Sequence, residues 1–338
     1  MKKRIVITGL GMIGDFGVGK DDFLNFIEGR KQKQEISDLN FDNYIDTTLL
    51  RRADQVSYFS SVAAKIALED ASLLDSAGNQ KAYKLGAIVG TVHGALEYTI
   101  EYHKALALDN PLTVSPSLFS NSVLNAAASC ISNIFKILDY TVTIPGYAGV
   151  HQAIKIATEL INEGNIDVCL VGGVDVNNDF LVDAYSSCMD DSTLIAQHFG
   201  GSGFLVLETL DSALKRHSNI YAEVLGIEIT SADCKNLMKY KISPIKNLNL
   251  QSLSCVFTSA FHDKDSKKRE KLFLKYIDRK ETAIISCNRI FGYTFAAAES
   301  FQIILGVIKL GNSYNKVLTN HSSLTGSNAC LLIGKCIN

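Results

Sequence analysis

Cysteines are the most chemically versatile residues of this 338-residue chain, because a thiolate can attack an acyl group, bind a metal or form a disulfide. The eight of them are Cys130, Cys169, Cys188, Cys234, Cys255, Cys287, Cys330 and Cys336. None forms a C-x-x-C pair, and several stand in apolar, strand-like runs such as residues 168–171. This pattern predicts free, buried thiols in a reducing compartment, and neither a zinc site nor a disulfide framework.

Glycines with the spacing G-x-G-x-x-G follow the first strand-like run, at Gly9, Gly11 and Gly14. In dinucleotide-binding proteins such glycines let the backbone approach a pyrophosphate, and a helix opens at the third glycine. Here the helical pattern begins only near Asp21, and the polar residues 31–38 offer no second strand with a ribose-binding acid. The sequence therefore favours a tight turn at these glycines, and a nicotinamide-dependent oxidoreductase is the less favoured alternative.

Short apolar runs rich in β-branched residues recur along the chain and predict strands that are covered on both faces. These runs are residues 4–8, 86–90, 140–144, 168–171, 204–207, 222–227, 255–258, 283–286, 317–319 and 329–333. Helical spacing of apolar residues lies between them at 58–71, 150–161 and 296–310, and Gly164 is expected to end the second helix. The alternation of strands and helices predicts a layered α/β fold.

Composition and charge exclude several classes of function. The 33 lysines and arginines nearly balance the 35 aspartates and glutamates, so no basic surface for nucleic acid is expected. Hydrophobic residues make up 47% of the chain, yet no apolar run is long enough to cross a bilayer, and no apolar leader follows residues 1–4. We expect a cytoplasmic protein with a sizeable core, without a membrane or nucleic-acid partner, a metal or a cofactor.

Motifs spread over nearly the whole chain, in the same order, resemble those of the β-ketoacyl synthases, the condensing enzymes of the thiolase superfamily. The likeness begins with R-I-V-I-T-G-L-G-M at residues 4–12 and continues with R-R-A-D at 51–54, which leads into an Ala-rich helix at 63–71. It extends through G-T-V-H-G-A-L-E at 90–97, V-S-P at 114–116, V-G-G-V-D at 171–175, G-S-G-F at 201–204 and the segment 320–329.

The resemblance implies a fold that agrees with the alternation of strands and helices. In that family two βαβαβ halves form a five-layered αβαβα sandwich. An N-terminal ketosynthase-like half is expected over residues 1–210, and a shortened C-terminal half over residues 211–338. The polar stretch 231–249 is expected to be a loop that replaces a longer helical segment.

Condensation in this family requires a cysteine at a helix N-terminus, two histidines and a lysine. This chain departs from the family at those positions. Gly146 stands at the cysteine position in Y-T-V-T-I-P-G-Y-A-G, and in N-R-I-F-G-Y the lysine becomes Asn288 and the second histidine becomes Tyr293. Residues 256–261 contain neither the first histidine nor its glycines, so the family's catalytic set is absent.

Other side chains near these positions are less suited to replace the nucleophile. The phenol of Tyr147 is a poor acyl carrier unless strongly activated. No base and no helix N-terminus is predicted beside Cys130 or Cys287. His93, His103 and His151 are interpreted as packing or hydrogen-bonding residues, His262 as a surface or turn residue, and the family's gating loop becomes S-L-T-G at 323–326.

Within the family, this loss matches the chain-length factors of type II polyketide synthases, which pair with an active ketosynthase. The resemblance implies that this chain is such a non-catalytic subunit, with a ketosynthase partner and an acyl carrier protein that binds through the complex. Most chain-length factors have glutamine at the cysteine position, so Gly146 departs from their pattern. An atypical acyltransferase with a different nucleophile is the alternative.

Two further sets of residues follow from the resemblance. The family dimerises through the strand before the nucleophile, here Tyr140, Thr141, Val142, Thr143 and Ile144. The wall of the acyl tunnel is expected to comprise Leu96, Thr99, His103, Leu118 and Phe119. The first three are spaced i, i+3, i+7 and share one helical face. The alternative for all five is simple packing in the interface core.

Overall fold

The computed structural model describes residues 2–34, 39–51, 53–75, 78, 80–81, 84–108, 112, 114–176, 178–188, 200–231, 245, 247–260 and 264–337. None of the helices within these ranges is both long enough and apolar enough to cross a membrane.

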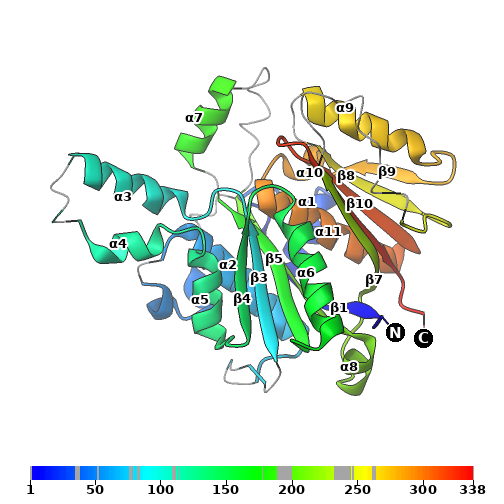
Figure 1. Ribbon diagram of the computed structural model, residues 1–338, viewed down its shortest axis with the longest axis horizontal. Helices are drawn as coiled ribbons and strands as arrows, with labels where there is room; N and C mark the ends of the chain where they lie inside the picture. Colours follow the sequence, from blue (N-terminus) through cyan, green and yellow to red (C-terminus); the bar gives the residue numbers. More distant parts are fainter. Residues whose placement is uncertain are drawn as a thin grey trace.

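One mixed sheet of eleven strands runs through the described part of the molecule (Figure 1). Its strands are β1 Ile5–Gly14, β2 Gly17–Val18, β3 Leu85–Thr91, β4 Tyr140–Pro145, β5 Val168–Asp175, β6 Gly201–Thr209, β7 Ala222–Ser231, β8 Cys255–Ala260, β9 Ala283–Ser286, β10 Lys316–Ser322 and β11 Ser327–Gly334. The order is β4-β3-β5-β6-β1-β7-β11-β10-β8-β9, with β2 paired to β1. Every run predicted as a strand overlaps one of these elements, so the strand predictions are confirmed.

The strand order repeats itself across the centre of the sheet. In the first half β3 lies between β4 and β5 and runs parallel to both, while β6 pairs antiparallel with β5 and β1. In the second half β8 lies between β9 and β10 and is parallel to both, while β11 pairs antiparallel with β10 and β7. The two halves meet where β1 and β7 pair antiparallel. The chain therefore builds one five-stranded unit twice.

Helices cover both halves and fill the space between them. They are α1 Gly19–Ile27, α2 Gln55–Asp70, α3 Leu96–Leu108, α4 Pro116–Asn121, α5 Ala126–Phe135, α6 Gly149–Glu163, α7 Asp179–Cys188, α8 Leu210–Lys215, α9 Lys264–Phe273, α10 Asn288–Phe291 and α11 Phe295–Asn312. In Figure 1, α2 and α5 cover the outer face of the first half, α6 and α11 lie between the halves, and α9 covers the second half. This is the predicted five-layered αβαβα sandwich.

The glycine-rich segment differs from its prediction. Gly9 and Gly11 lie inside the buried strand β1 and not in a tight turn. A Cβ atom at Gly9 would stand 2.2 Å from the carbonyl oxygen of Ala67, and one at Gly11 would stand 2.0 Å from that of Ala63. These glycines therefore let the backbone of α2 pack directly on the strand. The helix fills the space that a pyrophosphate would need, which removes the support for nicotinamide binding.

Two further predictions, the helix end at Gly164 and the loop at residues 231–249, have different outcomes. Gly164 adopts a φ of 79° directly after α6 and ends that helix, as predicted. Most of the polar stretch 231–249, expected to be a loop, lies outside the described residues. Within its described part, Leu248 packs into a small hydrophobic cluster with Leu253 and Phe273.

A fully buried carboxylate, that of Glu299 in α11, connects the central layer of helices to the second half of the sheet. Its Oε2 atom accepts hydrogen bonds from Nδ1 of His151 at 3.0 Å and from the backbone N–H of Val150 at 3.2 Å. Its Oε1 atom lies 3.6 Å from Nε2 of His321 on β10. The side chains of Glu299, His151 and His321 have no exposed surface. We call these three residues the central cluster.

The central cluster shifts the pKa values of Glu299 and His321. Burial alone would raise the pKa of Glu299, but the charge of His321 and the hydrogen bond from His151 outweigh burial and lower it. Burial lowers the pKa of His321, and the proximity of His151 adds to this effect. Both groups therefore release their protons more readily in the folded chain than in the unfolded chain.

We expect the free energy of unfolding to decrease on acidification. The unfolded chain takes up protons at His321 below about pH 6.5 and at Glu299 below about pH 4.3, before the folded chain does. The stability that these groups contribute is therefore present above those values and is lost as pH falls through the lowered folded-state pKa values. Urea denaturation between pH 8 and pH 5 measures the His321 part.

Two variants test the origin of this pH dependence. His321→Gln should flatten the profile between pH 6.5 and pH 5, whereas His103→Gln, at an exposed position of α3, should leave it unchanged. Glu299→Gln should cost about 1–3 kcal/mol at pH 8, since the amide weakens the hydrogen bonds that the buried carboxylate accepts from His151 and Val150. A wild-type profile that stays flat from pH 8 to pH 5 would contradict the assignment.

Candidate functional site

Gly146 lies where the first half of the sheet meets the central helices. It follows β4 directly, at the carboxyl end of the parallel strands β3 and β4, and precedes α6. Its φ is 98°, and its N–H donates a hydrogen bond to the carbonyl oxygen of Thr91 at 2.8 Å. Apart from its two chain neighbours, no heavy atom of the described residues lies within 4 Å of the place that a Cβ atom at Gly146 would take. This position, predicted to be a degenerate nucleophile, therefore has open space beside it and no side chain to react.

A row of polar side chains begins at the residue after Gly146. The hydroxyl of Tyr147 lies 3.1 Å from the hydroxyl of Tyr185 on α7. The Tyr185 hydroxyl lies 3.1 Å from Nε2 of His93, and Nδ1 of His93 lies 3.7 Å from the Asp175 carboxylate at the end of β5. We call Asp175, His93, Tyr185 and Tyr147 the tyrosine relay. His93 is thus a hydrogen-bonding residue, as predicted.

The buried carboxylate of Asp175 holds one end of this relay in place. It accepts hydrogen bonds from the hydroxyl of Thr91 and from three backbone N–H groups, those of Val92, His93 and Ala296. Hydrogen bonds of this kind stabilise an ionised carboxylate. Because Ala296 lies in the first turn of α11, the same carboxylate also joins β3 to the central layer.

Aromatic rings surround the relay. The ring centroids of His93 and Phe295 are 4.3 Å apart, those of Tyr185 and Phe295 are 5.2 Å apart, and those of Tyr293 and Phe295 are 5.1 Å apart. Tyr293, the residue predicted to stand at the second histidine position, is 2% exposed, and burial raises its pKa well above the usual value. The phenol therefore stays neutral, and the structure brings it into one cluster with Tyr147.

Asn288, the residue predicted to stand at the lysine position, is buried at the start of α10 and is hydrogen-bonded to the end of β8. Its amide donates to the carbonyl oxygen of Ala260, and its Oδ1 atom accepts from the hydroxyl of Ser259 at 3.1 Å. This neutral pair provides no positive charge. Sequence reasoning did not single out Ser259, and no motif marks it. His262 lies outside the described residues.

The turn at residues 323–326 connects β10 to β11 and takes the place of the family's gating loop. The N–H of Ser327 donates to the hydroxyl of Ser323 at 3.0 Å, and Gly326 has a φ of 90°. The buried guanidinium of Arg269 in α9 donates to the carbonyl oxygen of Ser323 and to the hydroxyl of Ser266. These contacts fix one side of the turn.

The described cysteines have the properties of inert thiols. Cys287 is 3% exposed, and burial raises its pKa even though it directly precedes α10. Burial also raises the pKa of Cys130, raises that of Cys255 to about 11 and raises that of Cys330 to about 12. Because only the thiolate is a good nucleophile, none of these residues is poised to accept an acyl group.

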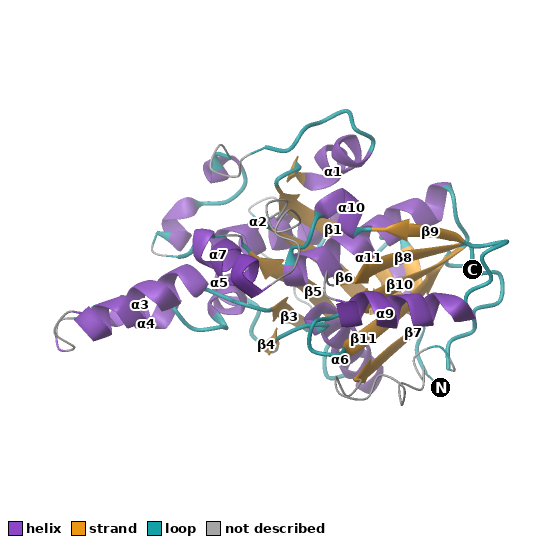
Figure 2. Cartoon of the chain, turned by 90° about the horizontal axis from the view of Figure 1, so that it is seen from above, coloured by secondary structure: helices purple, strands orange, loops and turns teal. Residues whose placement is uncertain are grey.

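The predicted tunnel residues do not join the site around Gly146 within this chain. They lie on α3 and α4, which form an arm that projects from the body (Figures 1 and 2). The Thr99 hydroxyl lies within hydrogen-bonding distance of the carbonyl oxygens of Ala95 and Ser122. Because these bonds hold α3 to the segment after α4, Thr99 has a structural role in the arm.

The exposure of the other tunnel residues varies. No residue of α3 is fully buried, although Leu96 is half-buried at its start. His103 is exposed, which differs from its interpretation as an internal residue. Leu118 is half-buried in α4, whereas the side chain of Phe119 is 55% exposed. A role of these residues in a tunnel stays a prediction.

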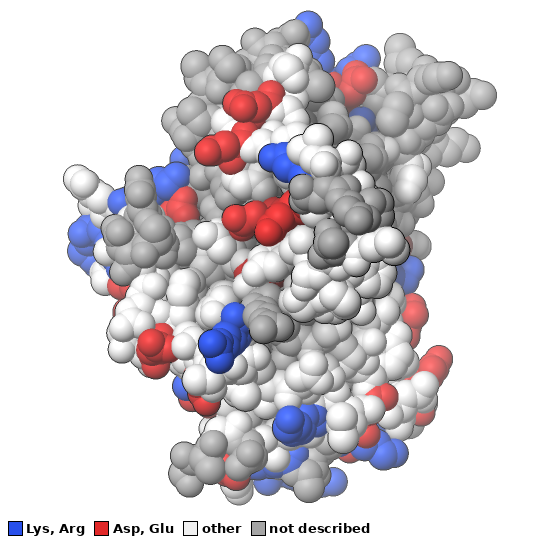
Figure 3. All heavy atoms as spheres, turned by 90° about the vertical axis from the view of Figure 1, so that its left-hand side faces the viewer, with Lys and Arg blue, Asp and Glu red and all other residues white. Residues whose placement is uncertain are grey.

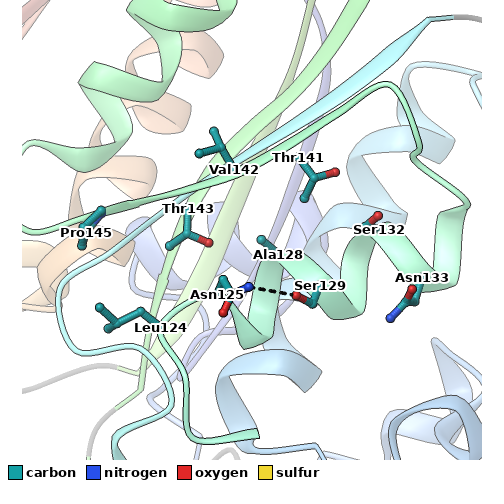
Figure 4. A pocket seen from close by; sticks show the side chains of 10 residues that line it. All are labelled: Leu124, Asn125, Ala128, Ser129, Ser132, Asn133, Thr141, Val142, Thr143 and Pro145. Atoms are coloured by element: carbon teal, nitrogen blue, oxygen red, sulfur yellow. Dashed lines mark hydrogen bonds between the residues drawn. The ribbon is translucent and has the colours of Figure 1, made fainter. Parts of the chain in front are cut away.

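Strand β4, which contains the predicted interface residues, forms one edge of the sheet. It pairs with β3 on one side only, and a hollow of about 590 Å³ lies between it and α5. Figure 4 shows Thr141 and Thr143 of β4 on one side of this hollow, with Asn125, Ser129 and Ser132 on the other. The structure shows β4 as a strand at the edge of the sheet, whereas its role in dimerisation stays a prediction.

Charged residues are missing from the sequence of this region. Residues 111–135 and 140–154 contain no Lys, Arg, Asp or Glu, although they include α4, α5 and β4. Figure 3, which views the molecule from the side on which the arm projects, shows a broad uncharged area. A β-strand at the edge of a sheet usually carries charges that prevent association. Helices α4 and α5 and strand β4 therefore form a surface depleted of charge, as the cores of protein interfaces are.

Comparisons with known proteins agree with this geometry. Residues 27–182 match the model of the beta-ketoacyl synthase N-terminal domain. The chain is 29% identical over 304 residues to 3-oxoacyl-[acyl-carrier-protein] synthase 1 of Buchnera aphidicola subsp. Baizongia pistaciae (strain Bp), covering 75% of this chain and 74% of that protein. The enzyme of the same name from Buchnera aphidicola subsp. Acyrthosiphon pisum (strain APS) is 27% identical over 358 residues, covering 91% and 86%.

Solved structures share the fold over nearly the whole length. The ishigamide ketosynthase/chain length factor superimposes with a TM-score of 0.84 at 18% identity and covers 100% of both chains. A type II PKS acyl-carrier protein in complex with its ketosynthase bound to the hexaketide gives a TM-score of 0.80 at 22% identity, covering 99% of this chain and 100% of that chain. At such identities the superpositions establish the fold. Together with the sequence matches, they show that the chain is similar to the β-ketoacyl synthases and shares their fold.

Proposed function

We propose that this chain is a chain-length factor, the non-catalytic subunit of a heterodimeric ketosynthase that builds a polyketide or polyene. Its partner would be an active ketosynthase that carries the acyl chain on its own cysteine. An acyl carrier protein would deliver malonyl units to the complex. The observation that carries the proposal is Gly146, which has no side chain at the nucleophile position of an otherwise complete scaffold.

The surroundings of Gly146 support a loss of condensation chemistry. Decarboxylation of a malonyl unit develops negative charge on an enolate oxygen, which needs donors or positive charge nearby. Asn288 and Ser259 form a neutral hydrogen-bonded pair, and Tyr293 is a buried neutral phenol. None of these groups supplies the charge that the family's lysine and histidines supply.

The uncharged surface supports a protein partner. Among the described residues, no strand neighbours the backbone N–H and C=O groups on the outer side of β4, and the hollow beside them is lined by apolar and small polar side chains. A homologous ketosynthase with its own exposed edge strand fits this surface, because strand-to-strand pairing would satisfy both edges. The projecting arm would then lie against the partner, where residues such as Leu96 and Phe119 could limit the length of the acyl chain.

The first prediction concerns the partner. Co-expression with a cysteine-bearing ketosynthase should yield a 1:1 complex, measured by affinity purification and light scattering. Val142→Glu should weaken the complex at least tenfold, since it places a charge in a dry interface. The matched control is Ile284→Glu on β9, the strand at the opposite edge, which is 36% exposed and should leave the complex intact. A stable monomer that binds no ketosynthase would count against the proposal.

The second prediction concerns the missing nucleophile. Gly146→Cys should not yield a condensing enzyme, because a thiol alone provides no group that stabilises the enolate. Condensation is measured with acyl- and malonyl-loaded carrier protein, and acylation by intact mass. Gly164→Cys is the control. Gly164 lies at the other end of α6, and it also has a positive φ and open space where a Cβ atom would lie.

Two outcomes of that experiment would change the interpretation. Condensation by the isolated Gly146→Cys variant would show that the acid–base residues have been misplaced. Acylation of the wild-type chain would favour the alternative of an atypical acyltransferase, and peptide mapping would then identify the nucleophile.

The third prediction concerns chain length. Leu96→Ala and Phe119→Ala should give longer products and Thr99→Trp shorter ones, with nearly unchanged turnover, because bulk at a channel end sets where elongation stops. Leu108→Ala, at the 82% exposed end of α3, is the control and should change nothing. Residues that only pack the interface would instead lower complex stability and total product together. If all three variants form intact complexes and make unaltered products, these residues do not form the wall of the tunnel.

A further inference from the structure

We propose that a small acidic pocket at the base of the arm binds the guanidinium group of an arginine side chain that the partner protein supplies. The pocket has a volume of about 180 Å³ and lies between the starts of α2, α3 and α7. Its lining includes Asp54, Glu97 and Asp179, and we call it the acidic pocket. The inference deepens the proposed function and rests on it for the identity of the partner, an active ketosynthase.

Three helices begin at the acidic pocket, and each contributes a carboxylate. Asp54 is the N-cap of α2, Glu97 lies in the first turn of α3, and Asp179 is the first residue of α7. The described residues that line the pocket include no lysine or arginine. An acidic residue at a helix N-terminus stabilises that helix, but three carboxylates around one small pocket repel one another. A cation in the pocket would offset this repulsion.

The carboxylate of Asp54 indicates most directly that the pocket receives a ligand. Asp54 is 3% exposed, and its Oδ1 atom accepts a hydrogen bond from the N–H of Ser57 at 3.0 Å. Its Oδ2 atom is buried and has no hydrogen-bond partner. Burial raises the pKa of Asp54, and the charge of Glu97 adds to this effect. A buried acceptor without a donor is costly, so a positively charged donor in the pocket would stabilise the carboxylate.

The arrangement of the carboxylates favours a guanidinium group. Among the described residues, no three His, Cys, Asp or Glu side chains are grouped as the ligands of a metal ion are. A guanidinium group is larger, and its five N–H donors can reach carboxylates on separate helices at once. It is also more weakly hydrated than an ammonium group, which lowers the cost of entering a buried site. The side chains of Val56, Leu96 and Val176 complete the lining and suit the apolar stem of an arginine.

The location of the acidic pocket indicates that the arginine comes from another chain. Glu97 lies at the start of α3, the first helix of the arm, which under the proposed function lies against the ketosynthase. The negative charge continues along two exposed helix surfaces, since Glu101 follows Glu97 by one turn and Asp183 follows Asp179 by one turn. Like charges at this spacing destabilise a helix. A basic segment of the partner would compensate for that cost.

The first measurement uses the full chain and Nα-acetyl-arginine amide as the probe, titrated at pH 8 and low ionic strength and followed by ligand-observed NMR. The corresponding citrulline amide has nearly the same shape without the charge. The arginine probe should bind, and the citrulline probe should bind at least tenfold more weakly. Asp54→Asn should weaken binding of the arginine probe about tenfold, because the amide replaces the charged acceptor. Asparagine is itself a good N-cap, so α2 should keep its start.

Matched variants separate this site from a general effect of negative charge. Asp46→Asn changes another N-cap aspartate, at the exposed start of the short helix Thr47–Leu50, and should bind the arginine probe like the wild type. Glu97→Gln, at an exposed position, should weaken binding two- to threefold. It decides the question if thermal unfolding shows that Asp54→Asn does not fold.

The second measurement is the affinity of each variant for the ketosynthase partner. Asp54→Asn and Glu97→Gln should weaken the complex at 50 mM salt and have less effect at 500 mM salt, whereas Asp46→Asn should not weaken it. Equal binding of the arginine and citrulline probes, or unchanged affinity of the complex in both pocket variants, overturns the inference. Failure of the proposed function gives a different result, since the wild-type chain and Asp46→Asn would then form no complex either.

Discussion

The buried carboxylate of Glu299 is the interaction on which the central layer depends. It accepts hydrogen bonds from the first turn of α6 on one side and faces His321 of β10 on the other. One side chain thus connects a helix of the first half to a strand of the second half. Gly146 and Tyr147 immediately precede that first turn. The position of the site is therefore determined by a charged cluster in the interior, where a lost partner is costly because water cannot replace it. This constraint explains why the scaffold around the site is retained whole although the site lacks the family's reactive groups.

The site itself has exchanged charge for neutral hydrogen bonds. Asn288 and Ser259 satisfy each other, and the phenols of Tyr147 and Tyr185 are within hydrogen-bonding distance of each other. A fixed positive charge would stabilise a developing enolate, whereas hydroxyl and amide groups bind neutral oxygen atoms without favouring a charged transition state over a ground state.

Most of the fold could be predicted from the sequence, because apolar periodicity and β-branched runs report burial directly. The strands, the central helices and the end of α6 at Gly164 follow from such local patterns. The glycines of β1 were misinterpreted because a close approach by a helix and a tight turn both require glycine, and only the position of α2 distinguishes them. The tyrosine relay could not be predicted, since His93, Tyr185 and Tyr147 are far apart in the chain and no spacing marks them. The loss of the nucleophile stays a prediction, which depends on the place of Gly146 in an ordered motif.

The two ends of the sheet differ in a way that bears on how large an assembly can become. Strand β4, at one end, has six residues and an uncharged surface beside it, whereas β9, at the other end, has only four. If only the β4 edge of the sheet pairs with another chain, the corresponding strand of the partner occupies that edge completely. No second unpaired edge is then available for a further chain. Association then stops at a closed pair and does not continue into an open filament. Under the proposed pairing through β4, the unequal lengths of the two end strands would limit the stoichiometry of the assembly.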